Sequence, residues 1–132
     1  MPISPKRPGF GSSACHWRVR RLEESGVIES YRAMLDQNAV GRPTTIFVEI
    51  TLASQSEEAL DQFERAVSDC RDVLECHLMA GEADLLLRIA ADGPGDFERI
   101  HRQQLTRLPG IACSIFVLRT VLAPRGLRLR ER

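Results

Sequence analysis

The side chains between residues 12 and 21 include several hydrogen-bond donors suited to a polyanion. Arginine and histidine nitrogens donate to phosphate oxygens or base edges, and serine hydroxyls near a helix N-terminus donate to phosphate. From Met1 to Arg21 the chain carries basic but no acidic residues, which favours a nucleic-acid partner for this end. A solvated basic helix that packs on its own domain is the alternative. The candidate DNA-facing residues are Ser12, Ser13, His16, Trp17, Arg18, Arg20 and Arg21.

A second candidate site is the short segment 81–84, which joins two apolar stretches. Exposed backbone amides in such a connection can bind a carboxylate, and Glu82 or Asp84 can bind an ammonium group. That pair of preferences suits an amino acid zwitterion. We expect Gly81 to supply the positive φ that a tight turn demands. A plain hairpin is the alternative reading. The candidate effector residues are Met79, Gly81, Glu82, Asp84 and Ser114.

Other kinds of chemistry lack support in the sequence. Cys76 and His77 are neighbours on a predicted strand and would point to opposite faces, so they cannot easily share a metal ion. The sequence holds no supported nucleophile–base set and no glycine-rich phosphate loop. We therefore expect no enzyme activity, no metal and no cofactor. Four cysteines without C-x-x-C spacing are expected to be small core residues.

Composition and charge narrow the class of protein. The 132 residues are 43% hydrophobic and 27% charged, which is typical of a globular chain. No apolar run could cross a membrane and the start lacks a signal peptide, so we expect a cytoplasmic protein without a membrane partner. The net charge of zero conceals basic ends and an acidic middle, in which six basic and thirteen acidic residues lie between 43 and 110. Four of these carboxylates are expected to form a solvated acidic face: Asp61, Glu64, Asp69 and Asp72.

The elements that would position the basic donors come first along the chain. Residues 1–11 are rich in proline and glycine and predict irregular structure. Apolar residues then recur at helical spacing, which predicts an amphipathic helix over 13–25 that Gly26 ends. A strand over 27–35 and a linker over 36–43 are expected to follow.

The rest of the chain predicts an α+β domain. Strands are expected at 44–52, 73–80, 84–91 and 111–122, and helices between the first two and the last two. The order β-α-β-β-α-β is that of a ferredoxin-like domain. Two helices would cover one face of the sheet, and the other would hold Phe47, His77, Met79 and further apolar groups. An exposed apolar face implies a partner surface, for which a second copy of the chain is the simplest occupant.

Several motifs of this sequence resemble those of the Lrp/AsnC family, the feast/famine regulators. Residues 15–28 are similar to that family's recognition helix and the turn after it, and 31–41 to its linker strand. Residues 81–87 resemble its Gly-x-x-Asp-Tyr loop, and 108–111 its Leu-Pro-Gly-Val turn. In this chain Leu85 stands where the loop usually has tyrosine, Gly11 where a helix-capping serine is usual, and the segment after Gly110 is about two residues short.

The resemblance implies four segments. They are an irregular N-terminus at 1–11, a partial winged helix-turn-helix at 12–42, a ferredoxin-like effector-binding and oligomerisation domain of the RAM type at 43–122, and a basic tail at 123–132. A transcription regulator is then expected that binds double-stranded DNA through the helix 13–25. It would sense an amino acid or related small molecule between dimers, and form homodimers and higher homo-oligomers.

The family places two further helices before the recognition helix, where this chain has about eleven irregular residues. A helix-turn-helix needs its first helix to fix the second in the groove. The resemblance therefore predicts an N-terminally truncated, misassigned or degenerate copy. A DNA-free oligomeric amino-acid sensor remains the alternative function.

Overall fold

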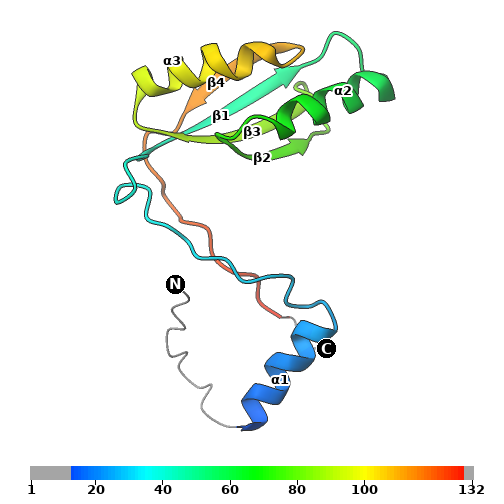
Figure 1. The fold of residues 1–132 in the computed structure, drawn as a ribbon, viewed down its shortest axis with the longest axis vertical. Helices are drawn as coiled ribbons and strands as arrows, with labels where there is room; N and C mark the ends of the chain where they lie inside the picture. The colour runs from blue at the N-terminus through cyan, green and yellow to red at the C-terminus, as the bar shows by residue number, and fades with distance from the viewer. Residues whose placement is uncertain (1–12, 130–132) are drawn as a thin grey trace. The chain divides into compact units, whose positions relative to one another are not determined.

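The computed structural model describes residues 13–129 and divides the chain between Met34 and Leu35 into two units. Helix α1 belongs to the first unit, and the four-stranded sheet with its helices belongs to the second (Figure 1). The segment 1–11, predicted to be irregular, and Ser12 lie outside the described residues.

In the first unit, α1 spans Ser13–Glu24, close to the predicted range. Gly26 follows with a φ of 83°, and its amide donates to the Glu23 carbonyl, so a left-handed glycine ends the helix as predicted. The predicted strand over 27–35 is wrong, because the described chain there is irregular. A strand requires a neighbour for its backbone hydrogen bonds, and no described strand pairs with this segment.

The second unit has the predicted ferredoxin-like order and belongs to the α+β class. The outer strands flank two central ones in the order β2-β3-β1-β4, with all neighbours antiparallel. Both long helices cover the same face of this sheet (Figure 1). The elements are β1 Thr44–Thr51, α2 Glu57–Ser68, β2 Val73–Leu78, β3 Leu85–Ala91, α3 Pro94–Gln103, the 3-10 helix η1 Leu105–Arg107 and β4 Ile111–Phe116.

Strand β1 lies at the centre of the core. Ile46, Val48 and Ile50 are fully buried, whereas the residues between them are only partly covered. This alternation follows from the period of two in a strand with one face under helices. Phe63 of α2 and Ile100 of α3 are likewise fully buried in the same cluster. At roughly 25 cal/mol per Å² of apolar surface, such side chains contribute about 1.5–3 kcal/mol each.

Local sequence explains where the two covering helices begin. The Ser56 hydroxyl accepts a hydrogen bond of 3.2 Å from the Ala59 amide and caps α2. Helix α3 begins at Pro94, because proline suits the first helical position. Asp96 in its first turn accepts from the Asp92 amide at 2.9 Å.

Strand β4 is shorter than the predicted range of 111–122. It pairs with β1 as far as the Phe116–Ile46 step, and one further hydrogen bond joins the Val117 amide to the Thr45 carbonyl. Strand β1 begins at Thr44, so residues beyond Val117 have no partner backbone in this sheet. Apolar alternation alone therefore predicts too long a strand, because β4 ends where its paired neighbour β1 no longer offers a backbone partner.

Two expectations about side-chain burial are wrong. Of the four cysteines only Cys70 is a core residue, while Cys76 and Cys113 are exposed because they lie on the two outer strands. Asp72 is not part of a solvated acidic face. It is buried and its carboxylate accepts hydrogen bonds from Arg42 and Gln104.

Gly110 is required for close packing at the end of β1. Its φ is 107°, and a Cβ atom built on it would lie 2.8 Å from the Thr51 carbonyl oxygen and 2.9 Å from the Ile50 Cγ2. Both a left-handed backbone and a backbone contact exclude a side chain here.

We expect Gly110→Ala to lower the free energy of unfolding by about 1–3 kcal/mol, because alanine strains this backbone and overlaps Thr51. Urea unfolding measures the change. Gly95→Ala is the matched control, since Gly95 lies in α3 with open space around it and no positive φ. The control is expected to be neutral or slightly stabilising, and equal losses in both variants would contradict this account.

Candidate DNA-facing helix and effector loop

The polar side chains of α1 gather on one side of the helix. At 100° per residue, Ser13, His16, Trp17, Arg20 and Arg21 fall within an arc of about 140°. All five are exposed. The opposite side carries the half-buried residues Cys15, Val19 and Leu22. Helix geometry thus brings five of the predicted DNA-facing residues onto one surface, whereas Arg18 lies on the flank beside Leu22.

Trp17 and Arg21 form an exposed pair on this surface. The Arg21 guanidinium carbon lies 4.9 Å from the centre of the Trp17 ring, and the tryptophan is 59% exposed. This contact is a cation–π interaction between residues one turn apart. It leaves the outward N–H groups of the arginine fork free to donate to other acceptors.

The segment between β2 and β3 is closed by backbone and side-chain hydrogen bonds that converge on Asp84. The Met79 amide donates to the Asp84 carbonyl at 2.8 Å, and the Asp84 amide donates to the Ile50 carbonyl at 2.9 Å. Asp84 Oδ2 accepts from the Leu52 amide and Oδ1 from Gln55 Nε2, both at 2.8 Å. The buried carboxylate therefore ties this loop to the end of β1 and to the segment before α2.

Among the remaining predicted effector residues, Met79, Gly81 and Glu82 are exposed in the same loop. The expectation of a positive φ at Gly81 is wrong, since the loop is longer than a two-residue turn and glycine is not needed there. Ser114 lies on β4, where it pairs with Val48 of β1, and β1 separates β4 from β3 and the loop.

The face of the sheet opposite the helices carries two different surfaces. Near β1 and β4 it is apolar: Phe47 pairs with Ile115, and Ile111 is 77% exposed. Near β2 and β3 it is charged, because Glu75 contacts His77 at 2.9 Å and Arg88 at 2.7 Å. The prediction of an apolar open face therefore holds for half of it.

Hydrogen bonds within the charged half stabilise the ionised carboxylate. The bond from His77, followed by that from Arg88, holds the pKa of Glu75 below its ordinary value. The register that pairs Glu75 with Arg88 across β2 and β3 creates this cluster. A β-bulge near Val73 shifts that register, and sequence alternation alone gives no sign of it.

Comparison with known proteins gives a consistent answer. The model of the Lrp/AsnC ligand-binding domain matches residues 45–127. An uncharacterised HTH-type transcriptional regulator of Sinorhizobium fredii is 41% identical over 89% of this chain and 94% of its own. The chain belongs to the Lrp/AsnC family.

Two further proteins are also similar to this member of the Lrp/AsnC family. The leucine-responsive regulatory protein of Escherichia coli is 36% identical over 80% of this chain, and the match spans 65% of that protein. A transcriptional regulator of Neisseria meningitidis in complex with L-Met superposes with a TM-score of 0.79 at 26% identity, covering 88% of this chain and 76% of its own. The Sinorhizobium fredii and Neisseria meningitidis proteins are named as transcriptional regulators, and the Escherichia coli protein as a regulatory protein.

Two further observations concern residues 13–129. No group of three histidine, cysteine or acidic side chains in this part could hold a metal ion. Its helices are also too short or too polar to span a membrane.

We expect Asp84→Asn to lower the free energy of unfolding by about 1–3 kcal/mol, because asparagine has one acceptor oxygen in place of two, so either the buried Leu52 amide or the exposed Gln55 side chain loses its acceptor. Urea unfolding without added ligand measures this. Glu82→Gln removes a charge from the exposed part of the same loop and is expected to change stability by less than about 0.5 kcal/mol. Equal stability of Asp84→Asn and the original chain would show that the carboxylate is not structural.

Proposed function

We propose that this protein is a ligand-responsive transcription regulator in which α1 contacts double-stranded DNA and the ferredoxin-like domain binds an amino acid. The match of residues 45–127 to the family's ligand-binding domain carries the proposal. The segregation of charge agrees with it, because an acidic body with a basic end directs only that end toward a polyanion.

The DNA contact is proposed for the exposed side of α1. His16, Arg20 and Arg21 can donate to base edges or phosphates, Ser13 near the helix N-terminus can donate to phosphate, and Trp17 adds an apolar surface. Ser12 and Arg18 are proposed as phosphate contacts at the margins. An affinity that depends on several phosphate contacts falls steeply with salt.

The effector site is proposed around the loop that Asp84 braces. Glu82 can bind the ammonium group of an amino acid, backbone amides near Gly81 can bind its carboxylate, and Met79 offers an apolar contact. The Neisseria meningitidis relative was crystallised with L-Met. Ser114 lies on β4, which β1 separates from β3 and the loop, and we propose it as a contact in a site formed between copies of the chain.

Self-association is proposed through the open face of the sheet. The exposed side chains of Ile111 and Ile115 make its apolar half costly to leave in water. A homodimer that covers this half, and higher homo-oligomers built from such dimers, would create sites between subunits. An effector then regulates DNA binding only if its affinity differs between the assembled states.

A DNA-free amino-acid sensor is the second candidate function. It is favoured by one observation: within residues 13–34 the described chain holds α1 as its one helix. Without a further helix to fix its orientation, α1 would bind DNA weakly.

We expect the full chain to retard a mixed-sequence DNA duplex at low salt, and Arg20→Ala to reduce the slope of log affinity against log salt by about 0.9. Gel shift over a salt series measures both. Arg102→Ala is the control, since Arg102 is an exposed arginine of α3 that pairs with Glu98 in the other unit. Absence of a shift at low salt would support the DNA-free sensor instead.

We expect saturating L-methionine or L-leucine to raise the melting temperature by about 4 °C or more, and Glu82→Ala to remove most of that rise. Differential scanning calorimetry measures the shift. Glu98→Ala removes an exposed carboxylate of α3 and is expected to keep it. An unchanged rise in Glu82→Ala would exclude Glu82 from the site.

A further inference from the structure

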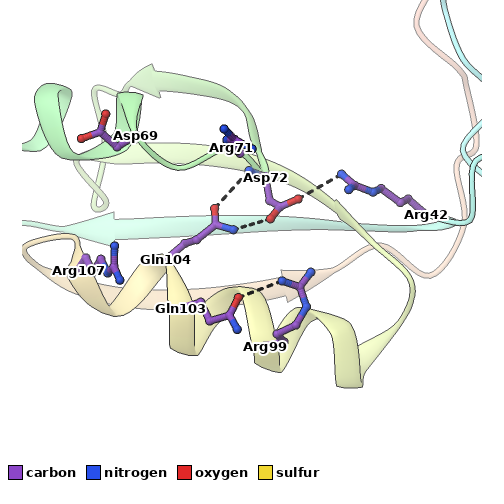
Figure 2. Close-up of a pocket in the computed structure, with 8 residues that line it drawn as sticks. All are labelled: Arg42, Asp69, Arg71, Asp72, Arg99, Gln103, Gln104 and Arg107. Atoms are coloured by element: carbon purple, nitrogen blue, oxygen red, sulfur yellow. Dashed lines mark hydrogen bonds and ion pairs between the residues drawn. The ribbon is translucent and has the colours of Figure 1, made fainter.

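A groove on the helix side of the sheet domain gathers four arginines from four segments. Arg42 precedes β1, Arg71 lies between α2 and β2, Arg99 lies in α3 and Arg107 in η1 (Figure 2). The groove has a volume of about 710 Å³, within the usual range for small-molecule sites. Its lining is otherwise polar or acidic.

The arginines of this groove divide into two kinds. Arg42 pairs with Asp72 at 3.1 Å, and Arg99 pairs with Asp96 at 2.7 Å. The guanidinium groups of Arg71 and Arg107 make no hydrogen bond or ion pair with any residue between 13 and 129, although the Arg107 backbone amide donates to the Gln104 carbonyl at 3.2 Å. The lining holds two carboxylates, those of Asp69 and Asp72, and the Asp72 carboxylate already accepts hydrogen bonds from Arg42 and Gln104. Two guanidinium groups therefore remain available to an anion.

The floor of the groove is held by a fixed set of hydrogen bonds. The buried Asp72 carboxylate accepts from both Arg42 and the Gln104 amide, and the Asp72 backbone amide donates to Gln104 Oε1 at 3.2 Å (Figure 2). Cys70 adds a contact from its Sγ to the Gln104 carbonyl at 3.8 Å. These bonds join the turn after α2 to the end of α3. Arg71 and Arg107 therefore lie on backbone segments that hydrogen bonds hold in place.

The concentration of positive charge here is unlike the rest of the domain. Residues 43–110 contain six basic and thirteen acidic side chains, yet three of the six line this groove. Guanidinium groups brought together repel one another unless anions neutralise them. The core packing does not require Arg71 or Arg107, since both are exposed and lie outside the buried cluster.

We propose that this groove binds a small molecule that carries two adjacent phosphoryl groups. The planar guanidinium fork matches the oxygens of phosphate with two parallel hydrogen bonds, and two unpaired forks match two phosphoryl groups. The site is separate from the proposed effector loop. Arg42 precedes the first residue of β1, whereas Asp84 contacts residues at its end.

Isothermal titration calorimetry of the full chain with inorganic pyrophosphate, at fixed ionic strength, tests the proposal. One saturable site per chain is expected, with orthophosphate and citrate binding more weakly. The double variant R71Q/R107Q is expected to weaken pyrophosphate binding by about tenfold or more, and R71K/R107K by less, because lysine keeps the charge without the fork.

The matched control is R119Q/R125Q, which removes the same charge from exposed arginines outside the groove. It is expected to change affinity by less than about twofold. Absence of saturable binding, equal weakening in the groove and control variants, or tighter binding of citrate than of pyrophosphate would each overturn the proposal. Circular dichroism of each variant confirms that the fold is kept, and a misfolded R71Q/R107Q is replaced by R107Q alone.

Discussion

Strand β1 supplies backbone hydrogen bonds to β3 on one side and β4 on the other, while every second side chain enters the core. Ile46, Val48 and Ile50 are fully buried beneath α2 and α3. A shift of β1 by one residue would turn this row outward and expose it to water. The position of the proposed effector loop depends on that register, because Asp84 bonds to backbone groups of Ile50 and Leu52 at the end of the strand.

Much of the second unit could be predicted from sequence because its signals are local. The alternation in β1, the capping serine before α2 and the proline–glycine pair after η1 each act within a few residues. The strand expected at 27–35 is wrong because a strand exists only with a paired neighbour, which local sequence does not reveal. The end of β4 likewise depends on β1, whose first residues are the last that β4 can pair with.

The parts of the candidate sites that sequence could not give are long-range contacts. Asp72 meets Arg42 and Gln104 across thirty or more residues, so a carboxylate expected on a solvated face is in fact buried. Gly81 and Gly110 also show that sequence alone does not reveal which glycines the fold requires. Gly81 lies in the loop that looked like a tight turn but needs no glycine, whereas Gly110 is required by the backbone of Thr51. For α1, helical periodicity was enough to predict which side chains share a surface, because all of them lie on one helix.

The hydrogen bonds of Asp84 bear on how the neighbouring loop would receive a ligand. With its carboxylate held by the Leu52 amide and Gln55, the loop is already ordered before anything binds. Little conformational entropy is then lost on binding, and the affinity of the contacts made there is largely retained. The same rigidity limits adaptation, so a preformed loop of this kind selects ligands by shape and favours a narrow range of side chains.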